Sequence, residues 1–195
     1  MVTAEQRALA DTAAAASAVS PPGIDAVWRA LDAVPDPEIP VVSVLGLGIV
    51  RGVEWDEGDP PTLVVKVTPT YSGCPATELI MTSIRDALAE LGATPVRLET
   101  RLAPAWTTEW ITPEAARKLR AYGIAPPVAR DAAPGRAAPV DVRGISPLRH
   151  AGAPVPCPRC GSQRTRLVSQ FGSTACKAQY RCDDCLEPFD YFKPH

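Results

Sequence analysis

Apolar residues recur through residues 24–123 with spacings that switch between helix-like and strand-like periods. Steps of three and four residues between apolar positions predict helices at residues 24–34, 75–91 and 112–123. Alternating or β-branched apolar runs predict strands at residues 49–55, 62–68 and 96–102. The order helix, strand, strand, helix, strand, helix predicts an α+β fold in which helices pack on one face of a small mixed sheet.

Capping residues set the expected ends of the last two helices. Pro75 suits the first position of a helix, which places Cys74 at its N-cap, and Gly92 follows the last apolar position. Thr112 is a good N-cap for the final helix, and Gly123 is a typical stop. These residues predict that the longest helix begins directly after a cysteine.

Residues 125–155 separate this domain from a C-terminal module. They are rich in Pro, Ala, Gly and Arg and have no sustained period, which is typical of a linker. The predicted organisation is a disordered N-terminus at residues 1–22, an α+β domain at 23–124, a linker at 125–155 and a small module at 156–195.

Composition narrows the functional classes. The 195 residues carry a formal net charge of −2, so no overall basic field attracts nucleic acid or membrane. Only His150 and His195 are available for histidine-dependent acid–base catalysis. Glu5, Arg7 and Asp11 interrupt any apolar stretch of a signal peptide, and no stretch approaches the roughly 20 apolar residues of a membrane helix. We expect a cytoplasmic protein with reduced thiols and no membrane partner.

Four cysteines of the C-terminal module have the spacing of a metal site. Two C-x-x-C pairs with 21 residues between them can present four thiolates to one ion, a donor set that suits Zn²⁺. Strands expected at residues 164–170, 178–181 and 187–193 complete a zinc-ribbon pattern, whose zinc would be structural. Iron on the same ligands and disulfides are the alternatives. The expected ligands are Cys157, Cys160, Cys182 and Cys185.

Cys176 is not needed for that tetrahedron and has two interpretations. A free cysteine is often a small buried apolar residue. The neighbouring Gly172, Ser173 and Thr174 instead favour an exposed loop, where Cys176 would be a spare ligand or a reactive thiol, with Lys177 favouring its thiolate.

Cys74 is the only cysteine of the first domain. At a helix N-cap, the free backbone N–H groups and the helix dipole would stabilise its thiolate. A metal-binding or reactive thiol is therefore the first interpretation, and a simple packing role is the second. Asp36 and Glu38, in a proline-bounded turn, are candidate hard ligands for iron beside the thiolate, or else a solvated turn.

Several stretches resemble a known family. Residues 36–40 (DPEIP), 47–51 (LGIVR) and 68–75 (TPTYSGCP) resemble the small α+β domain of iron–sulfur-cluster assembly factors. With the zinc-ribbon pattern, the FGSTACK stretch at residues 171–177 and the Trp106/Trp110 segment, the chain resembles the PaaD family of the bacterial phenylacetyl-CoA epoxidase, also called ring 1,2-phenylacetyl-CoA monooxygenase. The resemblance covers about residues 23–125 and 155–195.

The resemblance implies an accessory, non-catalytic role in aerobic phenylacetate degradation. Proteins of this family are thought to mature or repair a metal centre, in either the di-iron catalytic subunit or the iron–sulfur reductase subunit of the epoxidase. The family's cysteine falls on Cys74 and its acidic turn on Asp36 and Glu38, with Cys176 as a candidate second ligand for a transient iron or iron–sulfur cluster. One exposed thiol is a poor cage for a cluster, so a homodimer or a ligand from a partner is expected.

Two other functions are compatible with parts of the sequence. A zinc ribbon can bind nucleic acid or act as a structural adaptor, although basic residues of the module outnumber acidic ones by only two. A thiol oxidoreductase is the third option, but no C-x-x-C follows a strand in the first domain.

Overall fold

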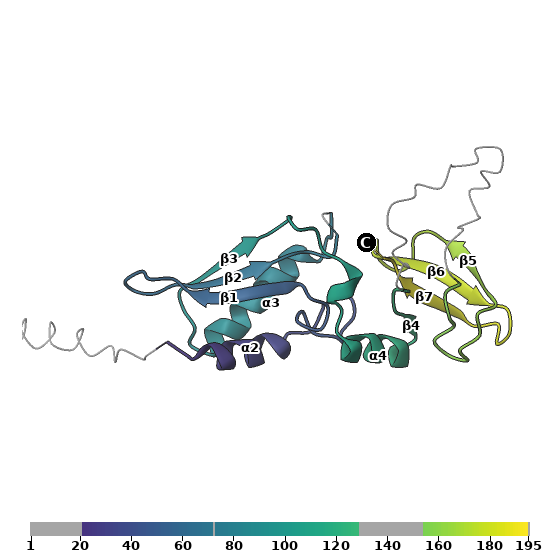
Figure 1. Cartoon of the computed structure of the whole chain (residues 1–195), viewed down its shortest axis with the longest axis horizontal. Helices are drawn as coiled ribbons and strands as arrows, with labels where there is room; N and C mark the ends of the chain where they lie inside the picture. The colour runs from purple at the N-terminus through teal and green to yellow at the C-terminus, as the bar shows by residue number, and fades with distance from the viewer. Residues whose placement is uncertain (1–20, 72, 129–153, 195) are drawn as a thin grey trace, which may run out of the picture.

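The computed structural model describes residues 21–71, 73–128 and 154–194, and the first domain is built on a three-stranded mixed sheet (Figure 1). Its strands are β1 (Val50–Trp55), β2 (Leu63–Val67) and β3 (Val96–Thr100), in the order β1-β2-β3. β1 and β2 form an antiparallel pair, and β2 and β3 are parallel. The parallel pair needs a crossover, which the intervening helix supplies.

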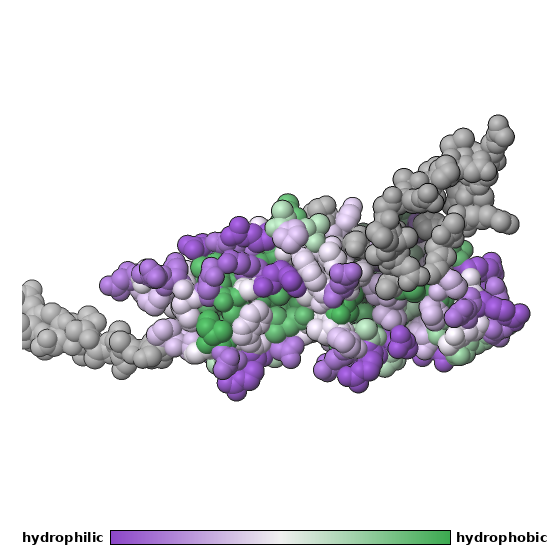
Figure 2. All heavy atoms as spheres, in the orientation of Figure 1, coloured by the Kyte–Doolittle hydropathy of each residue, from purple (hydrophilic) through white to green (hydrophobic). Residues whose placement is uncertain are grey.

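Helices α2 (Ile24–Asp32) and α3 (Thr77–Glu90) contact each other and cover the sheet (Figure 1). Their buried faces meet the sheet in one core, in which the fully buried residues include Leu31, Leu63, Val65, Ile84 and Leu88. In Figure 2, apolar residues of this face gather between α2 and the sheet, while hydrophilic residues cover the outer edges. The predicted α+β fold and element order are confirmed. No helix among the described residues combines the length and apolar character needed to cross a membrane.

The capping residues predict both ends of the last helix correctly but misplace the start of the longest helix. Helix α4 (Pro113–Tyr122) has Thr112 as its N-cap, whose side chain accepts a hydrogen bond from the Ala115 N–H at 3.1 Å, and it ends at Gly123 in the left-handed region. Helix α3, in contrast, begins only at Thr77, with Ala76 as its N-cap. Cys74 therefore lies in a turn before the helix rather than at its cap.

The C-terminal module is a four-stranded sheet that includes a strand from the first domain. Its strands are β5 (Thr165–Ser169), β6 (Lys177–Cys182), β7 (Pro188–Phe192) and β4 (Ile124–Ala125), in the order β4-β7-β6-β5. β4 pairs in parallel with β7. The predicted boundaries at residues 124 and 156 remain a prediction. Most of the predicted linker, residues 129–153, and all but two residues of the predicted N-terminus lie outside the described residues.

The two modules also share a hydrophobic core. Phe192, 1% exposed, belongs to the core cluster of the α+β domain, and its ring lies 6.0 Å from that of Trp106. The Trp106 indole N–H donates to the Leu47 carbonyl at 2.9 Å. The next residue, Gly48, has φ +68°, and a Cβ there would lie 2.6 Å from Cβ of Trp110, so the Leu-Gly pair allows the tryptophan segment to approach. The ribbon is therefore docked on the first domain.

Candidate functional site

The four predicted ligand cysteines of the ribbon lie together. Their sulfur atoms are all within 4.8 Å of one another, with Cys157 and Cys185 at 3.7 Å and Cys160 and Cys182 at 3.6 Å. Metal–thiolate bonds of about 2.3 Å in a tetrahedron require sulfur atoms about 3.8 Å apart. The donor set and spacing therefore fit one thiophilic metal ion, and none of the four cysteines forms a disulfide.

The four thiols of this cluster do not share one protonation behaviour. The backbone N–H of Cys185 lowers the pKa of Cys182 to about 7, whereas burial and neighbouring sulfur atoms raise the pKa of Cys160 and raise that of Cys185 to about 12. A bound metal would therefore have to displace protons from part of the cluster. The Cys182 N–H donates to the Glu187 carbonyl at 3.0 Å, and the Cys157 N–H donates to the Ser162 carbonyl at 2.9 Å. Each C-x-x-C pair is thus fixed by a turn of its own.

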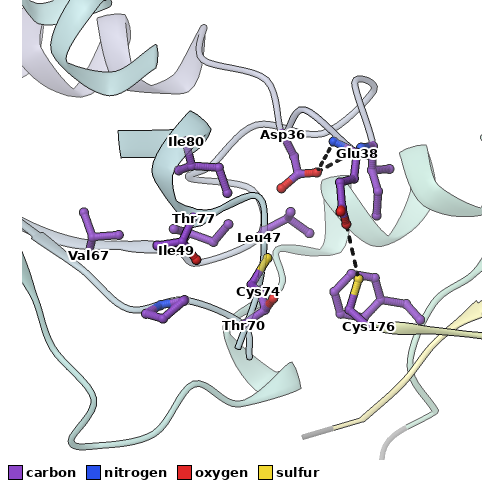
Figure 3. Close-up of a pocket in the computed structure, with 13 residues that line it drawn as sticks. Asp36, Glu38, Leu47, Ile49, Val67, Thr70, Cys74, Thr77, Ile80 and Cys176 are labelled. Carbon is purple, nitrogen blue, oxygen red and sulfur yellow. Dashed lines mark hydrogen bonds between the residues drawn. The ribbon is translucent and has the colours of Figure 1, made fainter. Parts of the chain in front are cut away.

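A small pocket, separate from the four-cysteine cluster, brings together the remaining candidate residues. Cys74, Asp36 and Glu38 from the first domain and Cys176 from the ribbon all line it (Figure 3). Its cavity volume is about 20 Å³, which is room for about one water-sized particle. The rest of its lining is mostly apolar: Ile39, Leu47, Ile49, Val67, Pro69, Thr70, Thr77, Ile80 and Phe192.

The acidic turn is pinned by its own backbone. Asp36 Oδ1 accepts the N–H groups of Glu38 and Ile39, both at 2.9 Å, and the Asp36 N–H donates to the Val42 carbonyl at 2.9 Å. Asp36 is only 7% exposed, so the alternative of a solvated turn is wrong for this residue. The turn directs the Glu38 carboxylate toward the ribbon, where Oε2 lies 3.8 Å from the Cys176 sulfur.

Cys74 is half-buried in the turn before α3. Its N–H donates to the Tyr71 carbonyl at 3.1 Å, and its own carbonyl accepts the Thr77 N–H at 3.2 Å. Burial raises the pKa of the Cys74 thiol, and the nearby Glu38 and Asp36 carboxylates raise it further, although the Ala76 N–H and the Thr77 side chain lower it. The expected net stabilisation of the thiolate by a helix N-cap is wrong, because the helix begins later and burial outweighs these two hydrogen bonds. A bound cation would be needed to favour the thiolate.

Cys176 is buried at the start of β6, with 8% of its surface exposed. Burial raises the pKa of its thiol, and its sulfur lies 3.0 Å from Thr174 Oγ1. The exposed loop expected from Gly172 to Thr174 is wrong for the cysteine itself. The first interpretation, a buried cysteine, is confirmed; the second, a spare ligand or reactive thiol, stays a prediction, and Cys176 lines the same pocket as Cys74.

The sequence interpretation missed one residue of this pocket. Phe192 lines it from the last strand, and the alternating apolar residues of the FDYF run predicted only a strand of the ribbon. Lys177, expected to favour the thiolate of Cys176, does lower the pKa of that thiol through its positive charge, although burial, the larger cause, raises it. The burial of Lys177, which is 4% exposed, was not predicted, because nothing in the local sequence distinguishes it from an ordinary surface lysine.

Asp36→Asn should change how stability depends on pH. Burial raises the folded-state pKa of Asp36 above its ordinary value of 3.8, so its contribution to stability is present at low pH and is lost as the pH rises through the folded pKa. Asparagine keeps the acceptor for both N–H groups and carries no charge. We expect the unfolding free energy of Asp36→Asn, relative to the native protein, to increase with pH above about 3.8, as measured by urea titrations.

Asp36→Ala separates the charge from the hydrogen bonds. It removes the acceptor as well and leaves two N–H groups without a partner, at a cost of about 1–3 kcal/mol each where they are buried. We expect Asp36→Ala to have a lower free energy of unfolding than the native protein at every pH measured. Parallel pH profiles for Asp36→Asn and the native protein would contradict a buried, destabilising charge.

Two family models match the chain, one for each module. Residues 24–97 match the model described as iron-sulfur cluster assembly protein, and residues 145–193 match the PaaD zinc beta ribbon domain. A protein of Escherichia coli (strain K12), provisionally named as a subunit of 1,2-phenylacetyl-CoA epoxidase, is 49% identical over 176 residues, which cover 90% of this chain and 95% of that protein. The chain belongs to the PaaD family of epoxidase subunits. The resemblance inferred from its motifs is confirmed.

Two solved structures are similar to about half of this PaaD-family chain. A Bacillus anthracis domain of unknown function, DUF59, is 27% identical, with a TM-score of 0.45, covering 49% of this chain and 89% of that one. A Mycobacterium tuberculosis protein, whose title associates it with Fe-S complex assembly and repair, is 31% identical with a TM-score of 0.33, covering 55% of this chain and 93% of that one.

Proposed function

We propose that this PaaD-family protein is a non-catalytic accessory protein that carries iron, or an iron–sulfur cluster, to a metal centre of the phenylacetyl-CoA epoxidase. The observation that carries the proposal is the pocket in which Cys74, Cys176, Glu38 and Asp36 converge. The iron-sulfur assembly model matched by residues 24–97 and the name of the Escherichia coli relative support it.

The donor set of the pocket suits a transient iron cargo. Thiolates and a carboxylate are soft and hard ligands for iron. Since burial raises the pKa of both thiols, binding must release protons, and the affinity should therefore fall in acid and favour release. A cavity of about 20 Å³ has room for one ion. Asp36 holds the turn, and Glu38 faces the cargo.

In this proposal the ribbon holds a structural metal, and a subunit of the epoxidase receives the iron cargo. Cys157, Cys160, Cys182 and Cys185 would hold a structural Zn²⁺, which would stabilise a module with few large apolar residues. The recipient would be the di-iron catalytic subunit or the iron–sulfur reductase subunit of the epoxidase. Cargo larger than one ion would need further ligands from a second copy of the chain or from the recipient.

Nucleic-acid binding by the ribbon is less well supported. Of its six basic residues, Arg164 is paired with Asp184, Arg166 is paired with Asp183 at 3.2 Å, and Lys177 is buried. These pairs neutralise much of the small basic surplus on which phosphate binding depends.

Anaerobic iron binding tests the pocket. The full chain, with its ribbon metal in place, should bind about one further Fe²⁺, because the pocket provides one set of donors. Cys74→Ser and Glu38→Gln should each weaken that binding at least about tenfold, which corresponds to about 1.4 kcal/mol. Glu78→Gln, the same change at an exposed position on α3, is the matched control. An unchanged affinity in Cys74→Ser would contradict the proposal.

A further inference from the structure

The ribbon forms part of the wall around Cys74. Cys176 and Phe192 line the pocket with Cys74 and belong to the core cluster of the α+β domain. The Phe192 ring lies 6.0 Å from that of Trp106, and the Lys193 N–H donates to the Cys176 carbonyl at 2.9 Å. Access to the half-buried sulfur of Cys74 therefore depends on the position of two residues from the C-terminal module.

One hairpin joins this wall to the four-cysteine cluster. β6 begins at Lys177, next to Cys176, and ends at Cys182, whose sulfur belongs to the cluster. β7 pairs with it in antiparallel fashion, from Lys177 opposite Phe192 to Arg181 opposite Pro188. At about 3.4 Å per residue the six residues of β6 span about 20 Å. The wall of the pocket and the cluster thus lie at opposite ends of the same two strands.

Apart from the cluster and its docking on the first domain, the ribbon has only a small core of its own. Its own core cluster contains only seven buried residues, two of which are cluster cysteines: Ala125, Val155, Cys157, Ala178, Cys182, Phe189 and Tyr191. A module with so small a core depends on its metal for folding. Loss of the metal would release the turns at one end of β6 and β7, and would weaken the register that holds Cys176 and Phe192 at the other.

We infer that the metal site of the ribbon controls access to Cys74. With the metal bound, the β6–β7 hairpin keeps Cys176 and Phe192 against the pocket; without it, the hairpin withdraws and the Cys74 thiol becomes accessible. The inference goes beyond the proposed function, because it concerns the wall of the pocket and holds whatever the pocket carries. The ribbon would then have a second role: its β6–β7 hairpin would cover Cys74 when the metal is bound and expose it when the metal is lost.

Thiol labelling of the full chain tests this inference. The rate at which N-ethylmaleimide modifies Cys74 would be measured by peptide mass spectrometry before and after removal of the ribbon metal with EDTA. We expect labelling at least about tenfold faster after chelation, since the labelling rate follows the population of the opened state. Hydrogen exchange of β2 should stay slow in both samples, which would show that the α+β domain remains folded.

Two phenylalanine variants distinguish withdrawal of the wall from general damage. Phe192→Ala removes the aromatic ring of the wall and should accelerate Cys74 labelling about tenfold or more while the metal stays bound, because a Phe→Ala change in a core strongly favours opening. Phe171→Ala, at a position 71% exposed in the same module, should leave the labelling rate of Cys74 unchanged.

The inference is overturned if Cys74 is labelled at its original rate once all four cluster cysteines have reacted with N-ethylmaleimide. It is equally overturned if β2 loses its protection at the same time as Cys74 becomes reactive. Neither of these two results depends on whether the protein delivers iron. Iron delivery is tested separately, by epoxidation in cells and by the iron content of the epoxidase.

Discussion

Replacing Cys182 with serine is expected to unfold the C-terminal module under conditions in which the native protein stays folded. Cys182 is fully buried, and its sulfur lies 3.6 Å from that of Cys160 within the cluster. A serine hydroxyl is a poor ligand for a thiophilic metal. A structural zinc site supplies about 10–16 kcal/mol of folding free energy in small zinc modules, as much as the whole stability of about 5–15 kcal/mol of a typical domain.

Metal content and limited proteolysis of the purified chain measure this effect. Cys182→Ser should lose about one equivalent of zinc, the capacity of one four-thiolate site, and β6 and β7 should become cleavable. Cys176→Ser is the matched control, because this residue lies in the same module but outside the cluster; it should retain zinc. If Cys182→Ser kept both its zinc and its resistance to protease, the assignment of the cluster as a structural metal site would be wrong.

Replacing Cys74 with serine is expected to reduce phenylacetyl-CoA epoxidation in cells to the level of cells that lack the protein. Serine is close in size to cysteine, so the turn between Tyr71 and Thr77 should persist, whereas the soft ligand is removed. The loss of epoxidation should exceed what any loss of stability would cause, because Cys74 is only half-buried beside the core and serine preserves its size. The measurement is the rate of substrate consumption by cells that express each variant at equal levels.

A control on α3, the helix that follows Cys74, separates the effect of the thiol from that of its surroundings. Thr82→Ala removes only an exposed hydroxyl that donates to the Glu78 carbonyl on α3 and should leave epoxidation unchanged. Normal epoxidation with Cys74→Ser would argue that the protein acts as an adaptor and carries no cargo.

Much of the fold follows from local patterns in the sequence. The period of apolar residues identifies the helices and strands of the α+β domain, and Thr112 and Gly123 define α4 because capping is a local interaction. The ribbon cysteines were predictable for the same reason, since two C-x-x-C turns can be recognised without knowledge of the rest of the fold. The start of α3 was not predictable, because the Cys74 backbone groups enter a turn with Tyr71 and Thr77 instead.

The candidate pocket depends on contacts that no local pattern contains. Glu38 and Cys176 are 138 positions apart in the sequence, and their 3.8 Å contact exists only because the ribbon docks on the first domain. Strand β4 illustrates the same limit: Ile124, the last residue of the predicted α+β domain, and Ala125, the first of the predicted linker, pair with β7. The sequence therefore predicts the chemistry of each site residue, whereas docking decides which of them meet.

The iron content of the epoxidase itself tests the central claim most directly. The epoxidase components would be purified anaerobically from cells that contain the native protein, the Cys74→Ser variant or neither, and their iron would be measured per complex. We predict full iron occupancy with the native protein and the same deficit in the other two samples, reversed when iron is restored to the purified components. Equal iron occupancy in all three samples would contradict the delivery of iron by this protein.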